Sequence, residues 1–469
     1  MKKFSKLSSK IESIYLFILS FLIIYVLIYN AFHYEPIQGY DGEAHHAYVQ
    51  NFLNIFVPNK TNQPASNFTY EFFSPPLPYI FPSFVNELCK FTISGTGKLD
   101  TCRQLYGFTS VVFTSILFLL TLIIYMKIMK LLFAKTNTMN LSILAVLGIF
   151  STNYKAISMI RGEVYILFLN ALLIYRFLLL SKKLFKYSKK DILIFGFIIG
   201  LLALSRQWAF LLFPSYFLLF FFLEKNIKKN YIKFLFFTFF IGFLLSGWFY
   251  INLLFDYGSL TAFNQTRTNF SFSNQELNFY LPFNNEAKLM FSKPIRPYFS
   301  NQFLPILYSD LWGDYWGYFS FTSRSLSEGK NQELIGDYLA RVNLISLLPT
   351  FMLFYGLKKS FNSLKIKNKK QIDLLNVYLV FSVFISFFGY LWFTVSFPND
   401  SGDTIKGAYI IQLFHLMGLC LSLYFENLKK QNLNKYYALI SLFFFIFIHN
   451  LSAMTSNFPF LSNVLHNLF

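Results

Sequence analysis

The hydrophobic residues of this chain fall in long blocks and do not alternate with polar residues. About eleven blocks approach the ~20 residues that an α-helix needs to cross the hydrocarbon core of a bilayer. The first, Ile11 to Phe32, is too long for a signal peptide and ends in no small-residue cleavage site, so we expect it to be retained. The pattern predicts an all-α polytopic membrane protein. The expected spans are 11–32, 105–126, 141–154, 164–180, 191–205, 207–223, 231–252, 343–357, 374–396, 406–425 and 436–452, of which those near 141, 191 and 207 are the shortest.

Lysine-rich tracts with few acidic residues separate these blocks. Short loops rich in lysine lie on the cytoplasmic side of a membrane. With every tract placed inside, the path of the chain is consistent, the N-terminus lies in the cytoplasm and the C-terminus lies outside. Heavy use of Lys, Asn, Phe and Ile indicates an AT-rich genome, so we expect a bacterial inner membrane. The tracts lie within 2–10, 127–135, 182–190, 225–229, 358–370 and 429–435.

Two segments are too polar for the bilayer, and both fall on the expected outer side. One is the first outer loop, 34–102, and the other is a long loop, 253–342, that is rich in Asn, Ser, Tyr and Trp and precedes the last four spans. The chain therefore divides into an N-terminal membrane module (1–252), the long outer loop and a C-terminal membrane module (343–469). Because most acidic residues lie in the outer segments, we expect the chemistry or the recognition there.

The first outer loop is expected to contain two helices that lie along the membrane surface. Asp41 suits the N-cap position of the first helix. The second begins at Ser74-Pro75-Pro76, since proline is tolerated in the first turn of a helix. Each helix has an apolar face with helical spacing: Ala44, Tyr48, Phe52 and Ile55 in the first, and Leu77, Ile80, Phe81, Phe84, Val85 and Leu88 in the second.

The overall composition excludes a soluble protein. Of the 469 residues, 55% are hydrophobic, 21% are aromatic and 13% are charged, whereas a soluble domain carries roughly 25% charged residues. The net charge of +19 alone would point to nucleic acid. Its lysines, however, lie in short tracts between apolar blocks. The positive charge therefore indicates which loops lie in the cytoplasm, and we expect no nucleic-acid partner.

The strongest local candidate for chemistry is the acidic pair Asp41 and Glu43, just outside the first span. Carboxylates at the mouth of a membrane bundle can deprotonate a hydroxyl group or hold a divalent cation. The alternative is structural, because Asp41 also suits a helix cap. His45 and His46 are adjacent and point to different sides of a helix, so they form a poor metal pair.

Three further charges stand at the ends of expected spans. A charge at membrane depth costs at least ~2.5 kcal/mol, so it usually faces a cavity, a partner or a polar ligand. Arg161 and Glu163 either serve such a purpose or pair with other charges. Arg206 interrupts two apolar runs, and its guanidinium suits a phosphate, although a turn residue at the interface is the alternative.

The long outer loop places Trp312 and Trp316 beside Asp314. Aromatic rings next to carboxylates are common where proteins stack on sugar rings and bond sugar hydroxyls. An interfacial aromatic belt explains the tryptophans equally well, and both interpretations stay open.

The cysteines give a further indication of sidedness. Cys89 and Cys102 both lie in the first outer loop, where an oxidising compartment would allow a disulfide. Cys420 lies inside an expected span and is interpreted as a small packed apolar residue.

Several short motifs resemble those of the GT-C superfamily of membrane glycosyltransferases. The similarity is greatest to family-39-like members, namely protein O-mannosyltransferases and lipid A aminoarabinose transferases. Those enzymes carry an Asp-Glu pair after the first span and then a Tyr-x-x-x-Pro-Pro-Leu-x-Tyr element. This chain departs from them in separating the acids by Gly42 and in having Ser74 where the aminoarabinose enzymes have Lys. The motifs, which keep the order of the family, are Tyr40-Asp41-Gly42-Glu43, Tyr70 to Tyr79, Arg161-Gly162-Glu163, Gly200 to Arg206, Gly247 to Asn252 with Tyr257-Gly258-Ser259, and Lys406-Gly407-Ala408-Tyr409.

The resemblance implies transfer of a sugar from a polyprenyl-phosphate donor to a lipid, glycan or protein acceptor on the outer face. Asp41 would be the general base, with Glu43 as the second acid. Arg206 would stabilise the phosphate leaving group, with Arg161, Lys293 and Arg296 as weaker candidates. No cofactor is required, and a divalent cation (Mg²⁺ or Mn²⁺) held by Asp41 and Glu43 is the alternative. The residues expected to contact acceptor or sugar are His45, His46, Tyr70, Glu71, Tyr79, Trp312, Asp314 and Trp316.

Two other functions compete with this one. A transporter or lipid flippase would show inverted repeats and charges near the midplane, and the sequence shows no repeat. A lipid-linked polymer ligase or polymerase usually carries its key arginines in a late outer loop, whereas the best acidic motif here lies in the first loop. The expected partners are thus the lipid-linked donor, its acceptor and membrane lipids.

Overall fold

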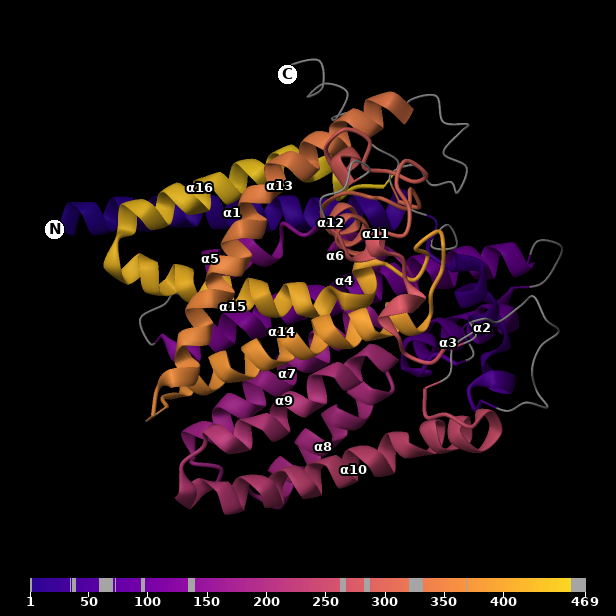
Figure 1. Ribbon diagram of the computed structural model, residues 1–469, viewed down its shortest axis with the longest axis horizontal. Coiled ribbons are helices and arrows are strands. Elements are labelled where there is room, and N and C mark those ends of the chain that lie inside the picture. The colour runs from indigo at the N-terminus through magenta and orange to yellow at the C-terminus, as the bar shows by residue number, and fades with distance from the viewer. Residues whose placement is uncertain are drawn as a thin grey trace.

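The computed structural model describes residues 2–33, 35, 39–58, 71, 73–93, 98–133, 140–261, 267–281, 287–319, 332–367 and 369–456. Within these ranges the regular structure is entirely helical (Figure 1). The expected all-α class is therefore confirmed. The helices are α1 Lys2–His33, α2 Gly42–Ile55, α3 Leu77–Thr92, α4 Lys98–Leu132, α5 Leu141–Leu147, α6 Ser151–Ser158, α7 Glu163–Lys182, α8 Lys189–Ala203, η3 Gln207–Leu212, α9 Phe213–Leu218, η4 Leu219–Phe222, α10 Lys225–Tyr257, η5 Phe272–Asn274, α11 Leu277–Tyr280, η6 Ala287–Phe291, α12 Phe303–Trp312, α13 Gln332–Phe361, η7 Asn362–Lys365, α14 Gln371–Ser396, η8 Gly407–Ile410, α15 Ile411–Gln431, α16 Leu433–His449 and η9 Asn450–Ala453.

Eight helical segments in the described part of the chain are long and apolar enough to cross a membrane. They correspond to eight of the expected spans, and a ninth is reached if the bent pair α5 and α6 is counted as one span. The predicted count of about eleven is not confirmed, because the three shortest blocks form shorter or broken helices. The eight segments are Lys10–His33, Leu99–Leu132, Glu163–Lys182, Lys225–Tyr257, Ile335–Lys365, Gln371–Ser396, Gly407–Gln431 and Leu433–Ala453.

Each short block has a local reason for its length. The axes of α5 and α6 differ by 75° across the break around Gly148. Helix α8 has 15 residues and ends at Ala203. After it, Arg206 adopts an extended conformation (φ −165°), and only the short pieces η3, α9 and η4 follow. Polar backbone breaks thus lie inside the bundle, where neighbouring helices can satisfy the freed backbone groups.

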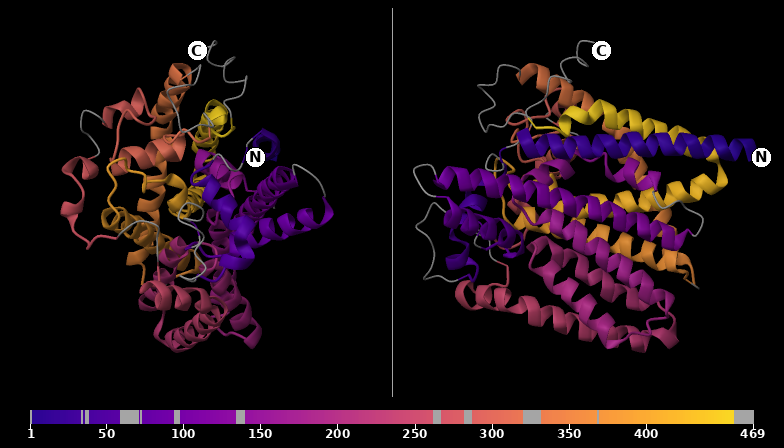
Figure 2. Two further views of the ribbon diagram at one scale, coloured as in Figure 1. Left: turned by 90° about the vertical axis from the view of Figure 1, so that its right-hand side faces the viewer. Right: turned by 180° about the vertical axis from the view of Figure 1, so that it is seen from behind.

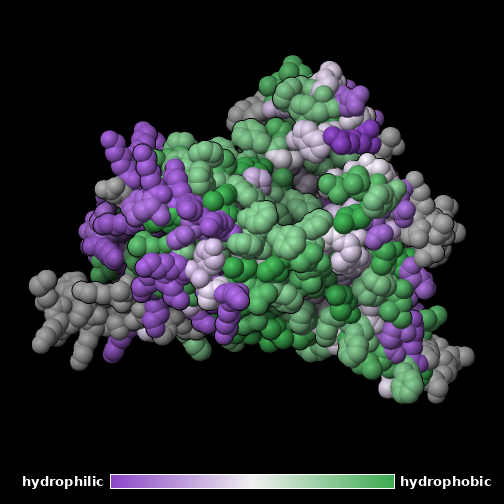
Figure 3. All heavy atoms as spheres, turned by 90° about the horizontal axis from the view of Figure 1, so that it is seen from below, coloured by the Kyte–Doolittle hydropathy of each residue, from purple (hydrophilic) through white to green (hydrophobic). Residues whose placement is uncertain are grey.

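The long helices form a bundle with two chemically different ends. The lysine-rich ends of α4, α7, α10, α13, α14, α15 and α16 all lie at the end where α1 begins (Figures 1 and 2). The short helices α2, α3, α11 and α12 lie at the opposite end. Figure 3 shows hydrophilic side chains gathered at the lysine-rich end and an apolar band over the middle of the molecule. The long helices expose rings such as Phe236 of α10 (67% exposed) and Phe351 of α13 (68% exposed), as expected for helices that face lipid.

Close packing between helices depends on small residues. A Cβ atom at Gly196 of α8 would lie 2.7 Å from Cβ of Ile241 on α10, and one at Gly242 of α10 would lie 2.6 Å from Ile199 of α8. Glycine is therefore needed for this approach, as is common between membrane helices. The most apolar window of the segment Gly407–Gln431, which contains α15, is 94% buried, so this segment is the centre of the bundle.

The first outer loop contains both predicted helices, α2 and α3. Cys89 of α3 and Cys102 of α4 form a disulfide, which ties the second helix to the bundle. Tyr48 of α2 and Tyr79 of α3 are buried together in a small apolar cluster. The loop is thus a folded wall at the end of the bundle opposite to the N-terminus.

Asp41 is at the predicted N-cap of α2, but its backbone is left-handed (φ 53°, ψ 27°) and its side chain makes no capping hydrogen bond. A cap residue normally has extended dihedral angles and accepts a bond from the N2 or N3 amide. The structural interpretation of Asp41 as a helix cap is therefore wrong at the level of the side chain. Its carboxylate is directed elsewhere.

Candidate functional site

Charged side chains from distant parts of the chain meet at the end of the bundle opposite to the lysine-rich end. Asp41 precedes α2, Arg161 and Glu163 flank the start of α7, Arg206 lies between α8 and η3, and Lys406 precedes η8. The ring of Tyr409 in η8 lies at their centre. The distances from its centroid are 5.1 Å to Arg161 Cζ, 5.7 Å to Arg206 Cζ and 5.5 Å to Lys406 Nζ. Three cations over one ring, with carboxylates around them, form an ionic cluster that we call the Tyr409 cluster.

Asp41 is held in the Tyr409 cluster by Lys406. The Nζ atom of Lys406 lies 3.2 Å from Oδ2 of Asp41 and 3.5 Å from Oδ1 of Asp403. The Lys406 side chain is 4% exposed, and that of Asp41 is 29% exposed. Burial acts to raise the pKa of Asp41, but the ammonium of Lys406 outweighs it and holds this pKa below its ordinary value. Asp41 is consequently a carboxylate at neutral pH and remains open to solvent on one side.

Arg206 is anchored by two carboxylates and a hydroxyl. Its Nη1 donates to Glu71 Oε2 at 2.8 Å and to Ser74 Oγ at 2.6 Å. Its Nε lies 3.5 Å from Glu163 Oε1. Burial acts to raise the pKa of Glu71, yet Arg206 holds that pKa well below its usual range. This set of contacts brings the Ser-Pro-Pro element of the first outer loop to the break after α8.

Arg161 completes the cationic side of the cluster and is less well satisfied. Its Nε lies 3.4 Å from Glu163 Oε2, and its Nη1 donates to the carbonyl oxygen of Tyr40 at 3.3 Å. The Nη2 atom is buried and has no hydrogen-bond partner among the described residues. A buried donor without a partner is costly. The fully buried Arg161 therefore has a donor available for a further polar ligand.

A second ion pair fixes the backbone around Lys406. Lys155 of α6 lies 2.8 Å from Oδ1 of Asp310 in α12, and both side chains are fully buried. The Tyr40 hydroxyl donates to the same oxygen at 2.5 Å, and the amide of Gly407 donates to Oδ2 at 2.6 Å. Asp310 thus holds the residues next to Asp41 and Lys406 in place.

The two histidines of α2 have different positions. His45 shares a hydrogen bond of 2.7 Å with the Tyr79 hydroxyl, and its Nε2 lies 3.9 Å from Glu71 Oε1. His46 instead shares a bond of 2.8 Å with Tyr106 of α4. Burial lowers the pKa of His45 to about 4 and that of His46 to about 3. Both rings are neutral at pH 7, and only His45 and Tyr79 border the cluster.

The remaining residues of the first outer loop that the sequence singled out lie elsewhere. Glu43 is exposed on α2 and forms no ion pair or hydrogen bond with the described residues of the cluster. Tyr70 lies outside the described residues. No group of three or more His, Cys, Asp or Glu side chains placed to hold a metal ion occurs in the described ranges. Because the Asp41 carboxylate faces the Lys406 ammonium, Asp41 and Glu43 do not fit a metal pair.

The aromatic and acidic residues of the long outer loop are used inside the fold. Trp312 donates to Thr350 Oγ1 at 2.9 Å, and Trp316 donates to the carbonyl oxygen of Ile405 at 2.9 Å. Asp314 Oδ2 accepts from the amide of Phe319 at 2.9 Å. All three side chains are buried. The contact of Trp316 supports the segment that carries Lys406, and none of the three side chains exposes a face on which a sugar could stack.

Two further cations of the long loop, Lys293 and Arg296, lie outside the group of charges around the Tyr409 ring. Lys293 is exposed, with Nζ 4.7 Å from the centroid of the Tyr298 ring. Arg296 Cζ lies 5.7 Å from the centroid of Trp316. Arg296 is thus linked to the Lys406 segment through Trp316, which is hydrogen-bonded to Ile405.

No protein-family model and no curated protein matches this chain. The Tyr409 cluster, together with the short motifs that resemble the GT-C superfamily, is therefore the basis for assigning a function.

Sequence reasoning singled out Asp41, Arg161 and Arg206, and the structure brings them together. It noted Lys406 and Tyr409 only as part of a family-like motif without a role, and it did not select Asp310. A signal for Lys406 was present in the sequence. It precedes a span on the side where the lysine distribution predicts few cations, and an isolated cation there indicates a local use. Lys155 is a similar case, because it lies at the end of an apolar block.

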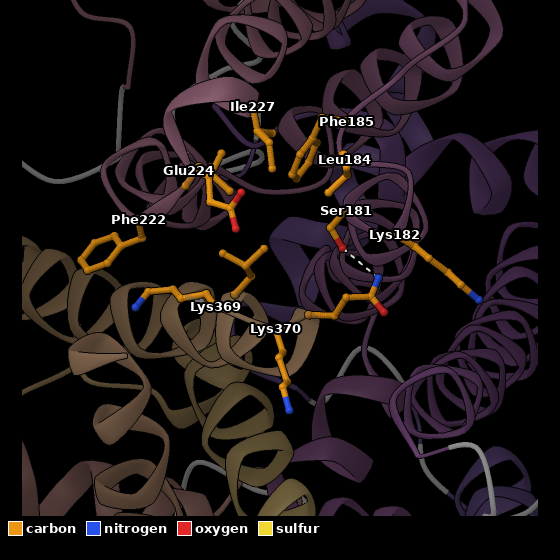
Figure 4. A pocket seen from close by; sticks show the side chains of 12 residues that line it. Ser181, Lys182, Leu184, Phe185, Phe222, Glu224, Ile227, Lys369 and Lys370 are labelled. Atoms are coloured by element: carbon orange, nitrogen blue, oxygen red, sulfur yellow. Dashed lines mark hydrogen bonds between the residues drawn. The ribbon is translucent and has the colours of Figure 1, made fainter. Parts of the chain in front are cut away.

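A cavity of about 380 Å³ lies at the lysine-rich end of the bundle, between the turns after α7 and η4 and the start of α14. Figure 4 shows the carboxylate of Glu224 directed toward this cavity and the ammonium groups of Lys182 and Lys370 directed away from it. Helix α7 runs from Glu163 in the Tyr409 cluster to Lys182 at the cavity. The cavity therefore lies one full helix length from the cluster and is no part of it.

Proposed function

We propose that this chain is a membrane glycosyltransferase of the GT-C kind, which moves a sugar from a polyprenyl-phosphate donor to a hydroxyl acceptor on the outer face of a membrane. The observation that carries the proposal is the meeting of Asp41 with Arg161, Arg206 and Lys406 around Tyr409. A carboxylate base beside several cations is the set of groups that such a transfer needs. The order of the motifs along the chain supports the same reaction.

The proposed step is a single displacement at the anomeric carbon. The acceptor oxygen forms a bond to this carbon while its proton passes to the Asp41 carboxylate. The bond from the anomeric carbon to the phosphate oxygen breaks, and its electron pair remains on the phosphate. The products are the glycosylated acceptor with inverted configuration and the polyprenyl phosphate.

The cations of the cluster would stabilise the negative charge that develops on the phosphate in this step. A phosphate leaving group gains a full negative charge, so it needs electrostatic stabilisation more than it needs a proton. Arg206 and Arg161 would supply that stabilisation, and the buried Arg161 Nη2 has no hydrogen-bond partner among the described residues. The Asp41 carboxylate lies 3.2 Å from the Lys406 ammonium, which lies 5.5 Å from the Tyr409 centroid, and this centroid lies 5.7 Å from Arg206 Cζ. Asp41 and Arg206 are therefore less than about 15 Å apart, a distance that one sugar-phosphate unit can bridge.

The position of the cluster suits a substrate that arrives through the membrane. It lies beside α3, whose outer face exposes Ile80, Phe84 and Leu88. Exposed apolar side chains on a helix next to a bundle are suited to contact with lipid. We infer that the polyprenyl tail remains in the membrane while the phosphate and sugar reach the cluster, and that the lysine-rich end faces the cytoplasm.

The test is transfer from radiolabelled polyprenyl-phosphate sugars in membranes that contain the protein. Wild-type protein should move label to an acceptor, and Asp41→Asn should reduce the rate on the order of 100-fold or more, because the base is lost. Asp400→Asn, in an exposed outer turn, is the matched control and should retain activity. Full activity of Asp41→Asn would exclude the catalytic role of Asp41.

The same membranes separate the transferase from a flippase. A flippase would move the labelled lipid between leaflets and leave it chemically unchanged, whereas the transferase converts it to polyprenyl phosphate. Thin-layer analysis of the lipid fraction distinguishes the two outcomes.

A further inference from the structure

Lys406 lies between the proposed base and the proposed phosphate site. Its ammonium contacts Asp41 and Asp403, and it lies 5.5 Å from the ring centroids of both Tyr40 and Tyr409. Arg161 and Arg206 lie over the same Tyr409 ring. The Lys406 ammonium is therefore close both to the proposed base, Asp41, and to the arginines that are proposed to bind the phosphate.

The contact with Lys406 has two opposite effects on Asp41. It keeps Asp41 ionised, as a base must be. It also occupies Oδ2, the oxygen at 3.2 Å from the ammonium, and a carboxylate bonded to an ammonium is a weaker proton acceptor. As long as the ion pair persists, Asp41 is poorly suited to take a proton from an acceptor hydroxyl.

The geometry offers a way to release Asp41. Lysine is a compact charge on a four-carbon stem with rotatable bonds, whereas the arginine guanidinium is a rigid planar fork. Arg206 is held by Glu71, Glu163 and Ser74, so it is fixed. Lys406 is less firmly held among the described residues: its ammonium has one short contact, to Asp41 at 3.2 Å, and a longer one to Asp403 at 3.5 Å, and the Asp403 side chain is 40% exposed.

We propose that Lys406 exchanges partners: its ammonium leaves the Asp41 carboxylate and pairs with the donor phosphate when the donor binds. This inference rests on the proposed function. The base is then released only in the donor complex, and the donor binds before the acceptor is activated. The Lys406 ammonium then also stabilises the leaving group, because the phosphate gains a negative charge when its bond to the anomeric carbon breaks. It is a phosphate ligand in the donor complex and a positioning residue for Asp41 in its absence.

A double-mutant cycle on ligand binding tests this exchange without any turnover. The probe is a polyprenyl monophosphate, titrated into protein in phosphatidylcholine nanodiscs and followed by tryptophan fluorescence. Asp41→Asn removes the competing partner of Lys406, so the affinity for the probe should rise about fivefold or more. Lys406→Gln should lower it, and Asp41→Asn in the Lys406→Gln background should give no rise.

The cycle also separates exchange from simple charge repulsion. If Asp41 acted only by repelling the phosphate, Asp41→Asn would raise affinity equally with or without Lys406, and the exchange would be overturned. No rise in the wild-type background would overturn it as well. Lys406→Met replaces Lys406→Gln if the latter does not fold, as judged by thermal unfolding of each variant.

The control variant is Glu12→Gln. Glu12 pairs with Lys429 at 2.6 Å in a comparable, partly buried ion pair at the lysine-rich end, so its loss should leave affinity for the probe unchanged. Polyprenol without phosphate is the second control. If wild-type protein binds polyprenyl phosphate no better than polyprenol, the proposed donor class fails together with the exchange. If it binds the phosphate but the cycle shows no coupling, the exchange alone fails.

Discussion

At the scale of single residues, Asp41 combines a backbone conformation and a contact that a simple helix cap would not have. Its φ of 53° lies in the left-handed region, which Asp and Asn tolerate better than other non-glycine residues. This conformation turns the carboxylate away from the amides of α2 and allows the pairing with Lys406. Aspartate at position 41 therefore matters in two ways: it tolerates the left-handed backbone, and its negative charge pairs with Lys406.

The two components can be separated by two substitutions. Asp41→Asn keeps a side chain that tolerates the left-handed region, whereas Asp41→Ala does not, so Ala should lower stability by about 1 kcal/mol relative to Asn. Thermal unfolding of the two variants in detergent micelles measures the difference. Equal melting temperatures for Asn and Ala would show that the left-handed backbone places no demand on this side chain.

The buried histidines predict a pH dependence of stability. The ordinary pKa of both is 6.5, and burial lowers it to about 4 for His45 and to about 3 for His46. As the pH falls below 6.5, the unfolded chain therefore binds protons that the folded chain does not, and the folded state loses stability. Wild-type protein should show a falling melting temperature between pH 6.5 and pH 4.5.

His46→Gln provides the comparison for this pH effect. It removes one of the two protonation sites but leaves a group that can bond to Tyr106. Its loss of stability over the same interval should be smaller by up to about 1.4 kcal/mol per pH unit. If the two proteins lost stability in parallel, His46 would not be the source of the effect.

At the scale of elements, the cluster is assembled by breaks in helices. Glu163 begins α7, Arg206 follows the end of α8, and Gly162 lies against the chain there. A Cβ atom at Gly162 would lie closer to the backbone carbonyl group of Ser205 than packing allows, and only 3.1 Å from the Cβ atom of Arg206. The contact of these two backbones is what brings Arg161 and Arg206 to the same ring.

Gly162→Ala should therefore disturb the Tyr409 cluster without touching any of its charges. Since the obstacle is backbone, one of the segments has to move, and displacement of a positioning group by ~1 Å can cost on the order of 100-fold in rate. Transfer assays measure this loss. Gly336→Ala in α13 is the control, because its added Cβ would meet Ile295 Cδ1 at an ordinary 3.8 Å, and it should leave transfer unchanged.

At the scale of the whole molecule, the proposed orientation places the lysine-rich end in the cytoplasm and the Tyr409 cluster outside. The disulfide between Cys89 and Cys102 lies on the cluster side, in agreement with an oxidising compartment there. The orientation predicts the reactivity of introduced cysteines toward a membrane-impermeant maleimide in intact cells. Asp400→Cys should be labelled and Lys228→Cys should be labelled only after lysis, whereas the reverse pattern would invert the topology.

The sequence allowed the long helices and half of the cluster to be predicted, for physical reasons that differ between residues. Apolar blocks predict helices such as α1 and α14 because lipid requires continuous apolar length. They also predict a short helix near 191 that ends close to Ala203. They do not reveal that Arg206, just beyond that end, pairs with Glu71 of the first outer loop. Asp41 and Arg206 were conspicuous as charges beside apolar runs. The pairing of Asp41 with Lys406 could not be read locally, because 365 positions separate them.

The internal pairing of the Tyr409 cluster has a consequence for selectivity. Its three cations, Arg161, Arg206 and Lys406, face the carboxylates of Asp41, Glu71 and Glu163. Such a neutralised site projects little field beyond its own radius, so it gives small water-borne anions little reason to accumulate there. A ligand that is already concentrated in the membrane by its tail does not depend on that field. Inorganic phosphate or a soluble sugar phosphate should accordingly compete poorly with the proposed lipid-linked donor, because only that donor would be concentrated at the site by a membrane-embedded tail.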